Sequence, residues 1–155
     1  MSVQFEEITK ETLYIALEII NSNTDYNVLE NGNAKRELAD MEKAFLNSVT
    51  TSVFIKLDDT YIGVIDYIME SPKDRCPWLG LLMIHRDYQG FGFGTQAYSL
   101  YEGEMHKRGL ERIRIGVLKE NGKAKEFWKS LGLISIKTAL NENGKEIFVY
   151  ERLFL

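Results

Sequence analysis

The sequence is poor in the residues that crosslink a chain or ligate a metal. Cys76 is the one cysteine among 155 residues, so neither an intrachain disulfide nor a thiolate cluster can form. The two histidines, His85 and His106, are too few for most histidine-based metal sites, and we expect no metal. No apolar run approaches the ~20 residues that span a bilayer, so we expect no membrane association either.

An excess of positive charge is also missing. The chain has 19 Lys and Arg against 23 Asp and Glu, a net charge of −4. Nucleic-acid binding needs a basic face that displaces counterions, so we expect no nucleic-acid partner. The first residues, Met1 to Glu7, contain neither a basic nor an apolar segment, which predicts no secretory signal and a cytoplasmic location.

What is present is an ordinary globular composition, with 45% hydrophobic and 27% charged residues. Only two prolines occur, and no segment has the composition of a linker, so we expect one domain over residues 1–155. Apolar periodicity predicts an α/β chain of order β-α-α-β-β-β-α-β-α-β-β, with a mixed sheet and helices on both faces. The expected strands are Val3–Glu7, 53–57, 61–67, Trp78–Ile84, 113–117, 133–139 and Glu146–Leu153. The expected helices follow Thr9, run from Ala34 to about Asn47 and from Thr95 to Arg108, and follow Asn121, whereas residues 21–33 favour turns.

A glycine-rich turn joins the apolar strand that ends at Ile84 to the helix that begins near Thr95. Gly90, Gly92 and Gly94 occupy alternate positions in this turn. Glycines at a helix start let several main-chain N–H groups point at one phosphate, although they can equally relieve strain in a tight turn. No lysine follows Gly94, which argues against a Walker loop, and the turn lies too late in the chain for a dinucleotide-binding fingerprint.

Two motifs in this region resemble those of the GNAT N-acetyltransferases. Gln89-X-X-Gly92-X-Gly94, after Met83-Ile84, is similar to the acyl-CoA signature of that family. Asn121-X-X-Ala124-X-X-Phe127-Trp128-X-X-X-Gly132-Leu133 resembles its second motif. The resemblance implies a GNAT-like fold over nearly the whole chain, with acetyl-CoA as co-substrate.

The resemblance also implies roles for individual residues. Main-chain groups of Met83 and Ile84 would pair with the pantetheine arm, and one of their N–H groups would bind the oxyanion. Asn121 and its helix, which carries Phe127 and Trp128, would contact the coenzyme near the thioester. The N–H groups expected to hold the diphosphate belong to Gln89, Gly90, Phe91, Gly92, Phe93, Gly94 and Thr95.

The implied reaction is direct attack of a neutral primary amine on the acetyl thioester in a ternary complex. Asp66 and Glu70, which we place on one face of the third strand, are the candidate catalytic carboxylates, and a solvated strand face is the alternative reading. Many members of the family protonate the thiolate with a tyrosine where this chain has Trp128. An indole N–H cannot supply a proton at neutral pH, and the helical spacing of Trp128 favours a role in the core.

The acceptor is expected to be a small molecule or a protein that carries an amine. If the family arrangement holds, residues 21–33 and the second helix border its cleft. A homodimer is a candidate assembly. A non-catalytic acyl-CoA-binding sensor or interaction module on the same fold is the alternative function, and a nucleotide-binding protein is a third, which the glycines alone support.

Overall fold

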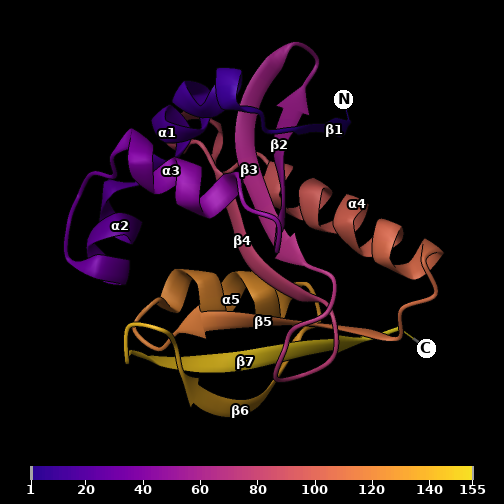
Figure 1. The fold of residues 1–155 in the computed structure, drawn as a ribbon. Coiled ribbons are helices and arrows are strands. Elements are labelled where there is room, and N and C mark those ends of the chain that lie inside the picture. Colours follow the sequence, from indigo (N-terminus) through magenta and orange to yellow (C-terminus); the bar gives the residue numbers. More distant parts are fainter. Residues whose placement is uncertain (1, 155) are drawn as a thin grey trace.

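A seven-stranded mixed sheet runs through the computed structural model, which describes residues 2–154 (Figure 1). Its strands are β1 (Val3–Glu7), β2 (Thr51–Leu57), β3 (Thr60–Ile68), β4 (Trp78–Ile84), β5 (Arg112–Leu118), β6 (Ile134–Leu140) and β7 (Glu146–Leu153). They lie in the order β1-β2-β3-β4-β5-β7-β6. The pairing of β4 with β5 is parallel and all other pairings are antiparallel, as the predicted order of elements requires.

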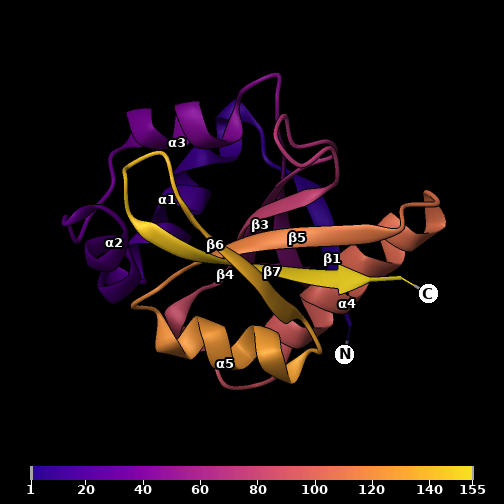
Figure 2. The same cartoon turned by 90° about the horizontal axis from the view of Figure 1, so that it is seen from below.

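Helices cover both faces of this sheet. They are α1 (Leu13–Asn21), α2 (Thr24–Asn31), α3 (Leu38–Phe45), α4 (Phe93–Lys107) and α5 (Gly122–Ser130), with short 3-10 turns η1 (Lys10–Thr12) and η2 (Arg86–Tyr88). Figure 2 shows α1, α2 and α3 on one side of the sheet and α4 and α5 on the other. The fold is therefore the predicted mixed sheet between two helical layers.

Each layer has its own hydrophobic core. On one face, Ala16 and Ile19 of α1 pack with Met41 of α3 against Val64 and Met83 of the sheet. On the other face, Tyr101 and Met105 of α4 and Trp128 of α5 pack against the sheet residues Ile65 and Ile115. Since β4 contributes Met83 to the first core and Leu79 to the second, it is covered on both sides, as its nearly continuous apolar sequence predicts.

The predicted turn region 21–33 is wrong, because α2 occupies most of it. Asn27, a residue that favours turns, is fully buried there, and its side-chain amide donates to the carbonyls of Ile20 (3.1 Å) and Ala34 (2.9 Å). These bonds, each to a residue seven positions away, hold α2 where its own sequence offers little apolar periodicity. The next helix begins at Leu38 rather than Ala34, because Glu37 and Asp40 form a capping box at its start.

No helix among residues 2–154 is both long enough and apolar enough to cross a membrane.

Candidate functional site

Strands β4 and β5 lie side by side at one end and separate at the other. They pair at Trp78↔Arg114 and Leu79↔Ile115, and no further pair joins them within residues 2–154. On their outer edges β4 stays paired with β3 up to Ile84, and β5 stays paired with β7 along its length. The second half of β4 therefore presents one unpaired main-chain edge to a gap in the sheet (Figure 1).

The main-chain N–H and C=O groups of successive residues along β4 point alternately toward β3 and toward this gap. The N–H of His85 donates to the carbonyl of Ile62 on β3 (2.7 Å), so Met83, two residues earlier, also points its N–H and C=O toward β3. Consistently, a Cβ placed on Gly63 of β3 would lie 2.5 Å from the Met83 carbonyl oxygen.

The groups that face the gap are those of Ile84 and Leu82, and of these the Ile84 carbonyl already accepts from the side-chain amides of Asn23 (3.1 Å) and Gln89 (2.9 Å). Of the two residues expected to pair with the pantetheine arm, Ile84 thus directs its main-chain groups toward the gap and Met83 directs them toward β3. Leu82, which strand alternation alone could have singled out, faces the gap as well.

The glycine-rich turn follows β4 and leads through η2 into the start of α4. Gly90 and Gly92 have φ angles of +86° and +84°, which glycine adopts without strain, and Gly92 is the N-cap of α4. Among residues 2–154, no hydrogen bond takes up the main-chain N–H groups from Gly90 to Thr95. Unpaired N–H groups at the positive end of a fifteen-residue helix form a site for an anion.

The main-chain N–H groups on either side of this unpaired set already have hydrogen-bond acceptors. That of Gln89 donates to the carbonyl of Arg86 (3.3 Å), and that of Gln96 donates to Gly92 (3.1 Å). Of the N–H groups expected to hold the diphosphate, that of Gln89 therefore already has a partner, because Gln89 is the C-cap of the preceding 3-10 turn. Gly94 serves packing, because a Cβ there would lie 3.4 Å from the ring of Phe127 on α5.

Helix α5 contributes a cap and a packing residue at this end of the sheet. Asn121 is the N-cap of α5, and its Oδ1 accepts from the N–H of Ala124 (3.1 Å). Trp128 is buried, with ring centroids 5.4 Å from Tyr98 and 4.9 Å from Phe127. The packing agrees with the core role predicted for Trp128, while the half-buried Phe127 lies next to the glycine-rich turn.

The two candidate catalytic carboxylates are not brought together. Asp66 lies on β3, where its Oδ1 accepts from the Ser52 hydroxyl (2.5 Å), and burial raises the pKa of its carboxyl group. Glu70 is not on the strand, because β3 ends at Ile68, and its side chain is exposed in the bend that follows. The shared face predicted for the pair is therefore wrong.

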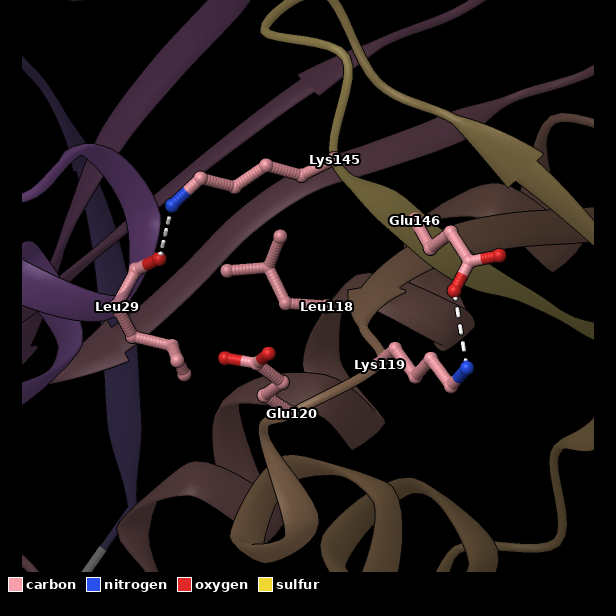
Figure 3. A pocket seen from close by; sticks show the side chains of 6 residues that line it. All are labelled: Leu29, Leu118, Lys119, Glu120, Lys145 and Glu146. Carbon is pink, nitrogen blue, oxygen red and sulfur yellow. Dashed lines mark hydrogen bonds and ion pairs between the residues drawn. The ribbon is translucent and has the colours of Figure 1, made fainter.

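An open pocket of about 240 Å³ lies beside the gap (Figure 3). Extending the β4–β5 register by three residues places Leu118 level with Leu82, so the end of β5 forms both one side of the gap and a wall of this pocket. The other walls come from α2 and from the turn between β6 and β7. The lining residues are Leu29, Leu118, Lys119, Glu120, Lys145 and Glu146.

Of the four charged side chains that line the pocket, three form a hydrogen bond or ion pair within residues 2–154, and one, Glu120, does not. Lys119 pairs with Glu146 (3.0 Å), and the Nζ of Lys145 donates to the main-chain carbonyl of Leu29 (2.6 Å). The carboxylate of Glu120 extends toward Leu29 in Figure 3, and within the described part of the chain it forms no hydrogen bond or ion pair. Glu120 was not predicted as a site residue, and its place directly before the motif residue Asn121 is the signal that could have drawn attention to it.

The part of the chain that the structure describes contains no group of three or more His, Cys, Asp or Glu side chains that could hold a metal ion.

Comparison with known proteins identifies relatives by sequence pattern and by fold. Residues 16–133 match the model of the acetyltransferase (GNAT) family. No curated protein matches the sequence. An acetyltransferase from Thermus thermophilus has a similar fold, with a TM-score of 0.83 and 20% identity over 99% of this chain and 98% of that one.

Two further solved structures show the same fold with bound or named substrates. The PaiA N-acetyltransferase of Thermoplasma acidophilum, solved in complex with coenzyme A, has a TM-score of 0.69 and 18% identity over 99% of this chain and 100% of that one. An acetyl transferase of Salmonella typhimurium that modifies the N-terminal serine of a ribosomal subunit protein has a TM-score of 0.80 and 12% identity over 99% of this chain and 96% of that one.

Proposed function

We propose that this chain, which belongs to the acetyltransferase (GNAT) family, transfers an acetyl group from acetyl-CoA to a primary amine by direct attack in a ternary complex. The observation that carries the proposal is an edge of β4 that pairs with no strand within residues 2–154 and leads into main-chain N–H groups, from Gly90 to Thr95, that no other described group binds. A coenzyme with an amide-rich arm and a diphosphate suits these two features in that order. Under this proposal the main-chain groups of Leu82 and the N–H of Ile84 pair with the pantetheine arm, and the N–H groups from Gly90 to Thr95 bind the diphosphate.

The chemistry follows from the position of the thioester in the gap. The amine nitrogen attacks the carbonyl carbon, and the N–H of Leu82 or Ile84, which face the gap, stabilises the oxygen as it becomes negative. The C–S bond then breaks, coenzyme A leaves as a thiolate, and the new amide nitrogen gives its extra proton to water. Because Trp128 is buried and its indole cannot give up a proton, we propose that the thiolate leaves without an acid from this position.

The incoming amine must lose a proton before it attacks. Asp66 retains the proposed role of proton acceptor, acting through water, because burial raises its pKa and so makes its carboxylate a better base. Glu70, exposed beyond the end of β3, has no feature that favours such a role, and we do not assign it one.

The acceptor is proposed to enter through the pocket beside Leu118. Its apolar walls, Leu29 and Leu118, suit an alkyl chain, and Glu120 offers an unpaired carboxylate for an ammonium group. The volume of about 240 Å³ accommodates a small amine or the end of a protein chain or side chain. This pocket supports a cationic amine, whether a small molecule or a protein amine, as the acceptor class.

A panel of amines, assayed by release of free thiol from acetyl-CoA, tests the proposal. We expect Glu120→Gln to raise the KM for a cationic acceptor at least tenfold and to leave the KM for acetyl-CoA unchanged, since the substitution removes the charge alone. Glu142→Gln is the matched control, because Glu142 is exposed in the neighbouring β6–β7 turn and does not line the pocket. Equal effects of the two substitutions would contradict the assignment of the pocket.

Trp128 at the family's tyrosine position supports one alternative, an acyl-CoA sensor without catalysis. Tight binding of coenzyme A with no thiol release for any amine in the panel would favour the sensor over the enzyme. Absence of coenzyme A binding would contradict both.

A further inference from the structure

The end of β4 is tied to the helical layer by a group of side-chain amides. The Nδ2 of Asn23 donates to the Ile84 carbonyl (3.1 Å), and the Nε2 of Gln89 donates to the same oxygen (2.9 Å). Gln89 Nε2 also donates to Asn23 Oδ1 (2.7 Å). We call the two side chains and this carbonyl the loop clasp.

A second contact reinforces the loop clasp from the neighbouring residue. Ser22 Oγ accepts from the main-chain N–H of Arg86 (3.1 Å) and donates to the Ile19 carbonyl (2.6 Å). Ser22 and Asn23 form the junction between α1 and α2, whereas Arg86 is the first residue of the 3-10 turn η2 and Gln89 directly follows it. The junction therefore holds the chain at both ends of η2.

The loop clasp explains how a turn with two glycines keeps a fixed shape. Gly90 and Gly92 leave the main chain many accessible conformations, and aligning its N–H groups upon binding would cost conformational entropy. Anchoring Gln89 through its side chain fixes the residue directly before the unpaired N–H groups, which begin at Gly90. The side chain of Gln89 is thereby directed to Asn23 and Ile84, and the diphosphate is left to the main chain.

We infer that Asn23 is a positioning residue that orients the glycine-rich turn for the diphosphate of acetyl-CoA, although it lies more than sixty residues away on the acceptor side of the molecule. This inference rests on the proposed function. Asn23 acts through Gln89 and the Ile84 carbonyl, and it is also the N-cap residue of α2, the helix whose Leu29 lines the acceptor pocket. The segment 23–29 thus contacts Gln89, directly before the glycines, through Asn23 at one end, and it lines the proposed acceptor pocket through Leu29 at the other.

Calorimetric titration with coenzyme A tests the inference on four variants. We expect Asn23→Ala and Gln89→Ala each to weaken binding about tenfold, the effect of losing ~1.4 kcal/mol of hydrogen bonding. The double variant should bind no more than a few-fold more weakly than either single variant, because both substitutions break one clasp. Asn47→Ala is the control, since its side chain also makes several hydrogen bonds, at the end of α3, and touches neither strand nor turn.

Kinetics separate positioning from general loss of structure. The KM for acetyl-CoA should rise in Asn23→Ala while kcat at saturating acetyl-CoA stays within about threefold of the original value. Unchanged affinity for coenzyme A in a folded Asn23→Ala chain, or in Gln89→Ala should Asn23→Ala fail to fold, would overturn the inference while leaving the proposed function intact. If the unaltered chain does not bind coenzyme A, both are overturned.

Discussion

The surroundings of Asp66 determine how readily its carboxyl group ionises. The residue alternates with Ile65 and Tyr67 on β3 and so lies on the opposite face from those core residues, with Ser52 of β2 directly across. Burial raises its pKa, and hydrogen bonds from Ser52 and Thr50 offset part of that effect. The ionised form is thus less favourable in the folded chain than in the unfolded one.

A raised pKa has a definite consequence for stability. When the pH is above the pKa that Asp66 has in the folded chain, the ionised carboxylate lowers the free energy of unfolding, because burial disfavours its charge only in the folded state. When the pH is below the pKa in the unfolded chain, near 3.8, the group is protonated in both states and this loss of stability is absent. We therefore expect Asp66→Asn, which can still accept from Ser52, to raise Tm by a few degrees at pH 7. The gain should disappear as the pH falls below 4. Thermal unfolding followed across this range by circular dichroism checks it, and a gain independent of pH would contradict the explanation.

At the scale of elements, the strands were the most predictable part of the chain. β1, β4 and β7 begin and end where the apolar patterns place them, because each pattern reflects burial of the same strand in the sheet. Helix α2 was missed, because buried side-chain bonds from Asn27 stabilise it in place of an apolar stripe. The residues directly before α3 are not helical, and Asn21 binds both the N–H (2.8 Å) and the carbonyl (3.1 Å) of Arg36 there.

Helix α5 provides a prediction about the departing thiolate. Trp128 packs edge-on against Tyr98, whose hydroxyl lies 3.1 Å from Glu102, so neither side chain is arranged to protonate sulfur. We expect Trp128→Phe to lower the free energy of unfolding by about 1–3 kcal/mol, since the smaller ring leaves a void. The value of kcat should change less than threefold.

Denaturant unfolding and thiol-release kinetics on the same Trp128→Phe preparation check both parts. A hundredfold loss of kcat in a stably folded variant would mean that the indole takes part in the reaction, because acid catalysis contributes on that scale.

At the scale of the whole molecule, the site combines segments that are distant in sequence. The glycine-rich turn and the start of α5 were recognisable from their motifs, since each depends on residues close together in the chain. Asn23 and Glu120 were not, because their roles depend on which strand edge and which helix lie beside them. Pairing of main-chain groups of β4 with the coenzyme was expected from family resemblance, but only the strand register identifies the residues that face the gap.

The central claim is that the main-chain N–H groups from Gly90 to Thr95 bind the diphosphate of coenzyme A. Nitrogen-15 NMR titration of the labelled chain tests it most directly, with coenzyme A in one series and pantetheine, which lacks the diphosphate, in the other. We predict large shifts of these amide resonances with coenzyme A and small ones with pantetheine, while Leu82 and Ile84 respond to both. Binding of coenzyme A that leaves the resonances of Gly90 to Thr95 unmoved would contradict the account.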